Sequence, residues 1–272
     1  MNDFWGLMFL PLAACLVLTG IHAYLGIHVV ERQVIFVDLA LAQIAALGAT
    51  VALLFGLDLH SPQTYWFSLA ATTAGAAVLA ATRSRKSRVP HEAVIGIVYA
   101  VAAAAAMLVL SFAAEGDEHI RHMLIGDILL VTRHEVIKMA LLYSAVGALH
   151  WYFRDIFLLI STQPEEAYHR KIKVRLWDFL FYATFGLVVT SSVQIAGVLL
   201  VFSFLIVPSV GAMLFSQGLK IRLLLGWSFG VLASAAGIAS SYYLNLPTGA
   251  ATVCAFGILL AGLAAIQKVR SQ

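Results

Sequence analysis

Apolar runs of about the length of a membrane-spanning helix follow one another along most of this 272-residue chain. A helix needs about 20 apolar residues to cross a hydrocarbon core of roughly 30 Å. Helices also satisfy every backbone N–H and C=O without water, as a segment in lipid requires. The pattern therefore predicts an all-α, polytopic transmembrane bundle. About nine spans meet the length requirement, at residues 4–30, 34–57, 65–82, 93–114, 136–153, 176–194, 195–214, 223–244 and 248–266.

One apolar run, residues 176–214, is too long for a single span. We place its division near Gln194 and expect a tight turn or a re-entrant piece there, although no strong turn signal marks the position. The first apolar run has no basic segment before it and no obvious small-residue cleavage site, so it is interpreted as a retained span and not as a signal peptide.

Composition supports a lipid-covered protein. The chain is 61% apolar and 11% charged, whereas a soluble domain carries about 25% charged residues. So many apolar side chains cannot all be hidden in one soluble core. Cys15 and Cys254 both lie inside apolar runs, so no disulfide framework is indicated.

The basic residues predict the orientation of the chain. If the N-terminus lies outside, all of the 17 Lys and Arg residues except Arg121, Arg133 and Lys138 fall in inner loops. By the positive-inside rule this bias predicts the N-terminus outside and the C-terminus inside, as an odd number of spans requires. The excess of basic residues behind the net charge of +3 is then explained by the orientation of the chain in the membrane. No nucleic-acid partner is expected.

Two polar stretches stand out between the apolar runs. The inner stretch 161–175 contains Pro164 followed by Glu165 and Glu166, with basic residues later. This order is typical of a short helix with a favourable dipole arrangement.

The outer stretch carries acidic residues and histidines at helical spacing. Glu115, Glu118, His119 and His122 stand at i, i+3, i+4 and i+7, and Asp127 follows. A helical turn would place the first four on one face, where carboxylate and imidazole groups suit zinc or manganese. We hypothesise a metal acceptor at the outer mouth of the protein. The alternative is a solvated loop whose acidic residues only limit positive charge.

Several segments, in order along nearly the whole chain, resemble the permease family of zinc, manganese and iron ABC importers. Residues 25–32 are Leu-Gly-Ile-His-Val-Val-Glu-Arg, similar to that family's Leu-Gly-x-x-Val-Val-x-Arg. Residues 196–201 and 205–208 resemble its small-Gly-Val-Leu-Leu-Val and Leu-Ile-x-Pro segments. Residues 241–249, Ser-Tyr-Tyr-Leu-Asn-Leu-Pro-Thr-Gly, are a further match, and weaker agreement is found at 95–97 and 163–165.

The resemblance implies a single transmembrane permease domain over residues 1–272, multi-pass in a bacterial cytoplasmic (inner) membrane. It implies a homodimer, two cytoplasmic ATP-binding cassette subunits that bind and hydrolyse ATP, and an extracytoplasmic metal-binding protein. No permanently bound cofactor is expected, only a transported metal ion. The chain has no Gly-x-x-x-x-Gly-Lys-Ser/Thr phosphate loop, so we expect a transport subunit and not an enzyme. The family's coupling helix corresponds to the cytoplasmic loop 161–175, with Pro164, Glu165, Glu166 and Ala167 as coupling residues.

The sequence departs from the family in the second span. The family's signature there is Gly-Asp-Ala-Leu-Ser/Ala-His, whose Asp and His share one helix face. In this chain the Asp position is Leu39 and the His position is Gln43. Asp38 comes one residue early, about 100° away around a helix, so it does not simply replace the missing carboxylate.

A pathway from other residues is one way to compensate. His22 and Gln43 lie about 12 and 13.5 Å from the inner ends of their predicted spans, with Asp38 nearer the cytoplasm. We hypothesise that His22, Asp38 and Gln43 line the pathway, because ionisable residues inside a membrane are functional candidates. His22, Asp38, His119 and His122 are then the candidate metal ligands. The alternative is that His22 and Asp38 are packing contacts, with Asp38 bonded to Arg32 or to a backbone group.

The sequence therefore favours the permease subunit of an ATP-driven importer of a divalent transition-metal ion, zinc or manganese. A second interpretation keeps the importer and makes an iron or other metal chelate its cargo, since a chelate needs shape more than ligands. A third, from another class, is a secondary transporter.

Overall fold

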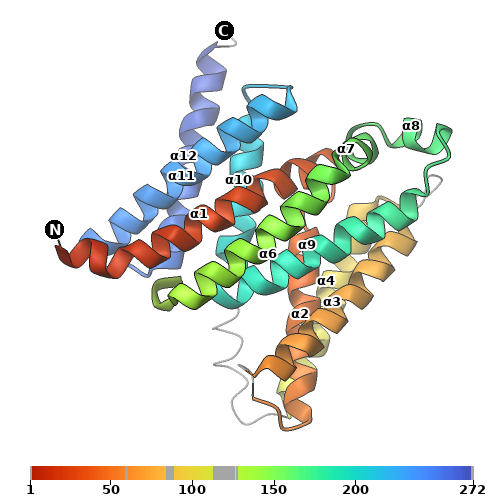
Figure 1. Ribbon diagram of the computed structural model, residues 1–272, viewed down its shortest axis with the longest axis horizontal. Coiled ribbons are helices and arrows are strands. Elements are labelled where there is room, and N and C mark those ends of the chain that lie inside the picture. Colours follow the sequence, from red (N-terminus) through yellow and green to blue (C-terminus); the bar gives the residue numbers. More distant parts are fainter. Residues whose placement is uncertain (1, 59–60, 84–88, 113–125, 127, 271–272) are drawn as a thin grey trace. The chain divides into compact units, whose positions relative to one another are not determined.

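The structure is a computed structural model that describes residues 2–58, 61–83, 89–112, 126 and 128–270. In these residues every regular element is a helix, which confirms the predicted all-α class. The chain divides into two compact units, which are described separately below. Unit 1 comprises residues 1–30, 124–147 and 194–272, and unit 2 comprises residues 31–123 and 148–193. Figure 1 shows the elements in chain colours.

Unit 1 contains α1 (Asn2–Glu31, except its last residue), most of α6 (Arg133–Tyr152), α10 (Val198–Met213), α11 (Leu219–Leu244) and α12 (Thr248–Arg270), with the short 3-10 helix η1 (Ile128–Leu130). α1 crosses α10 closely at Gly26, where a Cβ atom would collide with the carbonyl oxygen of Leu205 and the hydroxyl of Ser209. Small residues allow such close approach, and in a membrane this packing replaces the hydrophobic force between helices.

The α11–α12 connection of unit 1 is a tight helical turn. Asn245 ends α11 in the left-handed conformation, with φ of 51°. The hydroxyl of Ser241 donates to the carbonyl oxygen of Leu246 at 2.8 Å and lies 2.8 Å from the hydroxyl of Thr248. Left-handed Asn is a usual helix terminator, so the segment 241–249 fixes how the last two helices are joined.

Unit 2 contains α2 (Val37–Leu54), α3 (Pro62–Thr82), α4 (His91–Leu110), α7 (Arg154–Thr162), α8 (Pro164–His169) and α9 (Val174–Ala196, to Val193). α2 packs along both α3 and α4, as Figure 1 shows. α3 reaches α9 through Thr72, whose hydroxyl lies 3.2 Å from that of Thr190.

Seven helices are long and apolar enough to cross a membrane: α1, α2, α3, α4, α9, α11 and α12. An eighth span is possible if α6 and α7, which meet at an angle of 77°, count as one. α10 is apolar but has only 16 residues. The described part of the chain therefore offers seven or eight spans and this shorter helix, and the total of nine and the orientation of the termini remain predictions.

The long run 176–214 is divided as expected, but three residues beyond Gln194. α9 ends at Ala196 and α10 begins at Val198. Gly197, between them, has φ of 75°, a conformation that only glycine adopts readily. Gly197 is therefore the residue at which the chain turns, and it lies inside an apolar run.

Candidate transport pathway and coupling segment

The second predicted span, α2, carries the positions at which this chain departs from its family's pattern. Leu39 and Gln43 are half-buried, and so are Leu47 and Val51, which continue the same row at every fourth residue. This row, which we call the α2 row, is apolar except for Gln43. Asp38 points elsewhere, since it is only 2% exposed. The structure thus confirms that Asp38 does not occupy the face of the missing Asp and His.

Asp38 belongs to the buried first turn of α2. Its carboxylate lies against the backbone N–H groups of Asp38 and Leu39, and its Oδ1 has no hydrogen-bond partner among the described residues. Glu92, at the start of α4, accepts a hydrogen bond from the backbone N–H of Phe36 at 3.0 Å. Asp38 and Glu92 therefore lie in the first turns of α2 and α4. Glu92 also caps the beginning of α2 through the N–H of Phe36.

His22 lies in the other unit, on α1, and is fully buried. Its Nδ1 donates to the carbonyl oxygen of Leu18 at 2.9 Å, and its ring meets that of Tyr143 edge to face at 6.1 Å. A neutral imidazole that donates through Nδ1 carries its lone pair on Nε2, the form in which histidine binds metals. Because His22 belongs to unit 1 and Asp38 and Gln43 to unit 2, a pathway through all three remains a prediction.

The outer-mouth acceptor was predicted at residues outside the described part: Glu115, Glu118, His119, His122 and Asp127. His119 and His122 as metal ligands are untested for the same reason. Within the described ranges, no group of three or more His, Cys, Asp or Glu side chains is placed to hold a metal ion.

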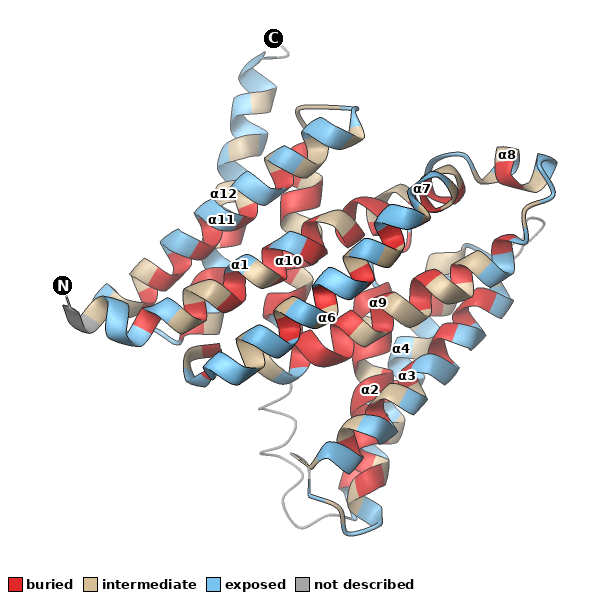
Figure 2. Ribbon diagram, in the orientation of Figure 1, coloured by how far each residue is buried: buried red, intermediate tan, exposed pale blue. Residues whose placement is uncertain are grey.

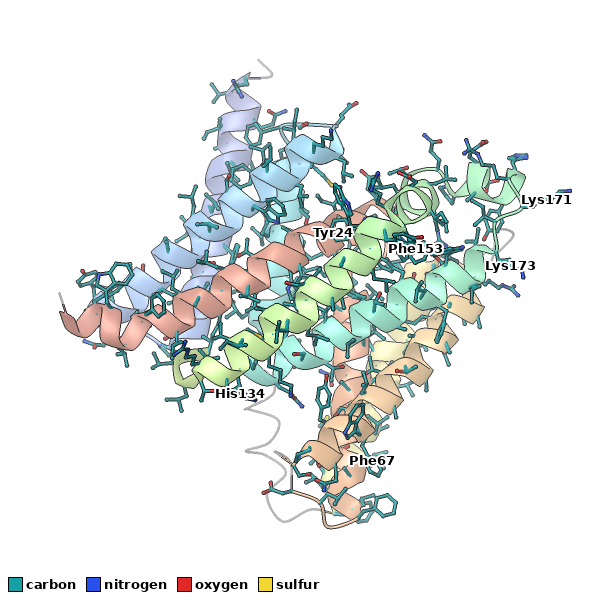
Figure 3. All side chains as sticks on the ribbon, viewed as in Figure 1. Tyr24, Phe67, His134, Phe153, Lys171 and Lys173 are labelled. Carbon is teal, nitrogen blue, oxygen red and sulfur yellow. The ribbon has the colours of Figure 1, made fainter. Side chains whose placement is uncertain are left out.

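The predicted short helix in the stretch 161–175 is confirmed as α8. Pro164 is its first residue, Glu165 and Glu166 lie in its first turn, and Arg170 follows its end. The Arg170 Nε donates to Glu166 Oε1 at 2.7 Å on the exposed side. Lys171 then adopts a left-handed conformation with φ of 56°, which turns the chain towards α9. Figure 3 shows Lys171 and Lys173 extending from this connection.

α8 is held to its neighbours by an apolar cluster. Ile160 of α7, Ala167 of α8 and Val174 of α9 are buried against one another. Tyr168, Ile172 and Trp177 pack around them. α8 is thus anchored on one side to α7 and α9, while Figure 2 shows much of the rest of α8 and its connections exposed.

One turn further along α9 lies a buried ion network that the sequence pattern did not predict. Asp178 Oδ1 accepts from Arg32 Nη1 and from Arg83 Nη1, each at 2.7 Å. The side chains of Arg32 and Asp178 are fully buried, and that of Arg83 is 16% exposed. Arg32 Nε also donates to Ser161 Oγ at 2.8 Å, and the guanidinium lies 3.9 Å from the centre of the Phe181 ring.

This network corrects one alternative from the sequence. Arg32 is bonded to Asp178 and Ser161, so the suggested Asp38–Arg32 bond is wrong. The suggested backbone bond of Asp38 fits its place at the start of α2. Asp178 could have been singled out from the sequence, because an ionisable residue near the start of an apolar run is a functional candidate.

Residues in the segments that resemble the importer family make contacts between helices or connect them. Gly26, in the first segment, packs on Leu205, in the Leu-Ile-x-Pro segment. Arg32 closes the first segment and binds Asp178. The segment 241–249 forms the α11–α12 turn. These positions are therefore explained by close helix contacts and buried charges.

Comparison with known proteins agrees with this arrangement. Over 231 residues, 84% of this chain and 79% of the relative, the chain is 27% identical to "Manganese transport system membrane protein MntC" of Listeria innocua. Over 184 residues, 68% of each chain, it is 26% identical to a "Probable iron transport system membrane protein" of Haemophilus influenzae. Among solved structures, PsaBC from Streptococcus pneumoniae in complex with Fab shares the fold, with a TM-score of 0.77 at 21% identity over 96% of this chain and 94% of the other.

The match to a family is nearly complete. The sequence profile of the ABC 3 transport family covers residues 5–266, which includes most of α1, most of α12 and every helix between them. Relatives named as membrane proteins of metal transport systems align with 84% and 68% of the chain. The family membership predicted from the ordered motifs is confirmed: this chain belongs to the ABC 3 transport family.

Proposed function

We propose that this chain is the transmembrane permease subunit of an ATP-driven importer that moves a divalent transition-metal ion, manganese or zinc, into the cytoplasm. The family match over residues 5–266 carries the proposal. The name of the Listeria innocua relative, a manganese transport system membrane protein, supports a metal cargo. ATP is hydrolysed by two cytoplasmic partner subunits, and an extracytoplasmic binding protein delivers the metal to a homodimer of this chain.

In this proposal the helix α8 is the element on which the ATPase subunit acts. It is short, exposed on one side and anchored on the other by Ile160, Ala167 and Val174. Movement imposed on α8 therefore reaches α7 and α9 through buried side chains and not through a flexible loop. Pro164, Glu165 and Glu166 provide its rigid first turn.

The proposed route for the metal uses His22, Asp38 and Gln43, with the outer acceptor Glu115, Glu118, His119, His122 and Asp127 before it. Asp38 Oδ1 has no hydrogen-bond partner in the described residues. Burying such a carboxylate in a membrane costs free energy, so its presence there points to a function. Imidazole and carboxylate oxygen together suit manganese and zinc.

The deciding experiment is metal uptake by proteoliposomes that contain this chain with its ATPase and binding protein. ATP-dependent uptake of free manganese or zinc is the expected result. His22→Ala and Asp38→Ala should each lower uptake at normal protein levels. His134→Ala and Asp155→Ala, at exposed positions, are matched controls that should leave uptake unchanged. Uptake without ATP would instead indicate a secondary transporter.

A second candidate cargo is a metal chelate, and the α2 row favours it. Leu39, Leu47 and Val51 are apolar and Gln43 is uncharged. This face can therefore pack against the organic part of a chelate but provides few ligands for a bare metal ion. ATP-dependent uptake of chelated but not of free metal would select this candidate.

The topology is part of the proposal: nine spans, the N-terminus outside and the C-terminus inside, in a bacterial cytoplasmic membrane. Cysteine substitutions at Gln33 and Leu246, both exposed loop positions, test it by labelling with an impermeant reagent in intact cells. Gln33 should be labelled only after the cells are opened, and Leu246 should be labelled from outside. The reverse pattern would overturn the orientation.

A further inference from the structure

The ion network of unit 2 joins four parts of the chain that are distant in sequence. Asp178 is in α9, Arg83 directly follows α3, and Arg32 lies between α1 and α2. Ser161, to which Arg32 also donates, is in α7 two residues before Gln163, where the chain turns into α8. A single buried carboxylate therefore ties the ends of several helices together.

The network is next to the apolar cluster that anchors α8. Val174 of the cluster and Asp178 of the network are four residues apart in α9, so they share one helix face. Ile160 of the cluster directly precedes Ser161 of the network in α7. A displacement of α8 that moves Val174 or Ile160 must therefore also move Asp178 or Ser161.

The network is also able to change its pairing. Both guanidinium groups use the same oxygen of Asp178, and Asp178 Oδ2 and Arg32 Nη2 have no hydrogen-bond partner in the described residues. Buried polar groups are nearly always satisfied, so unsatisfied ones call for an explanation. An unused acceptor on the carboxylate and an unused donor on Arg32 allow the hydrogen bonds of the network to be exchanged while the opposite charges stay paired.

The chain passes from unit 1 into unit 2 between Val30 and Glu31, one residue before Arg32. A shift of Arg32 is thus carried by the covalent chain into α1, and a shift of Arg83 into α3. We propose that Asp178 is a positioning residue for transport: it converts a movement of α8 into movements of α3 and of the α1–α2 connection through Arg83 and Arg32. This inference rests on the proposed function, since it assumes that an ATPase subunit moves α8.

The test uses the complete complex in proteoliposomes and measures ATP hydrolysis and manganese uptake in the same preparation. Asp178→Asn keeps the shape of the side chain and removes its charge. We expect the ATPase subunits to remain bound and hydrolysis to continue, while uptake per ATP hydrolysed falls at least about fivefold, the lower end of coupling factors between distant sites. Asp178→Glu, which restores the carboxylate, should recover part of this ratio.

Two further variants keep the test decisive if Asp178→Asn does not fold. Asp178→Asn with Arg83→Gln removes one charge of each sign, so the net charge of the network is unchanged while the Arg83–Asp178 ion pair is lost. The ratio should fall as in the single variant. Ser161→Ala leaves the carboxylate in place; it removes the bond from Arg32 Nε and the hydroxyl's own bond to the Phe157 carbonyl within α7, and should lower the ratio less. Asp155→Asn is the matched control, because this aspartate of α7 is 90% exposed, and it should keep the wild-type ratio.

The outcomes separate the two proposals. A wild-type ratio in Asp178→Asn or in the double variant overturns the positioning role, and so does a wild-type ratio in Ser161→Ala if neither of those accumulates. A parallel loss of hydrolysis and uptake with an unchanged ratio also overturns it, because it marks a purely structural residue. Absence of ATP-dependent uptake in the wild-type complex, for free metal and for chelates, contradicts the proposed function itself.

Discussion

Asp178 Oδ1 lies 2.7 Å from Arg32 Nη1, although 146 positions in the chain separate the two residues. Both side chains are fully buried. Removing one partner of such a pair leaves an uncompensated charge, which costs more than the intact pair contributes. The pair therefore fixes how α9 is placed against the α1–α2 connection within unit 2.

Asp178→Ala should destabilise the protein by about 3–5 kcal/mol, since it leaves two guanidinium groups without their carboxylate. Unfolding in detergent, followed by the loss of the monodisperse peak on heating, measures the effect. Asp155→Ala should leave the unfolding temperature nearly unchanged, because its ion pair with Arg154 is long, at 3.8 Å, and exposed. Equal unfolding temperatures for the two variants would contradict the buried pair.

Gly26→Ala should destabilise unit 1. The added methyl group would collide with the backbone of Leu205 in α10, and overpacking of this kind typically costs about 1–3 kcal/mol. Gly20→Ala is the control in the same helix: nothing lies within 4 Å of its Cβ position, so the better helix propensity of alanine should keep or raise the unfolding temperature. An unfolding temperature for Gly26→Ala at or above that of Gly20→Ala would show that α1 and α10 are farther apart than described.

Ala167→Asp should separate the coupling segment from its anchor, because it puts a charge among Ile160, Val174 and Trp177. We expect the chain to reach the membrane but to retain less ATPase subunit in a pull-down through an affinity tag on this chain. Glu166→Ala removes only an exposed i,i+4 pair with Arg170, worth about 0.3–0.5 kcal/mol, and should leave the folded stability nearly unchanged. Normal capture of the ATPase by Ala167→Asp would contradict the role of α8.

Leu39→Asp with Gln43→His should create a divalent-metal site on α2. The two positions are one turn apart on the half-buried α2 row, so a carboxylate and an imidazole there can approach one ion. Titration of the purified variant with manganese and with zinc should show saturable binding that neither single variant shows. Equal binding by Gln43→His alone would mean that other residues complete the site.

The sequence was sufficient for the elements and for the family, because both depend on local patterns. Apolar runs located the long helices but not α7, and Pro164 with Glu165 and Glu166 predicted α8. The one-residue offset of Asp38 was also predictable, since 100° per residue is a property of any helix. The burial of Asp38 and the half-buried state of Leu39 and Gln43 agree with it.

The pairing of Asp178 was not predictable in this way. No periodicity links it with Arg32 or Arg83, because their distances in the chain are set by how several helices return to one end of unit 2. Gly197 was missed for another reason. Glycine is common in membrane helices, so its need for a left-handed φ of 75° was not marked by the residue type alone.

The short helix α10 has a consequence for how membrane thickness acts on this protein. Its 16 residues extend about 24 Å, less than the roughly 30 Å of the hydrocarbon core. Backbone near one of its ends would therefore lie at hydrocarbon depth, where only a covering of protein satisfies it. Within α10 only Leu199 is exposed. A thicker or thinner bilayer should accordingly act on α4 and α12, the least covered spans, and hardly on α10.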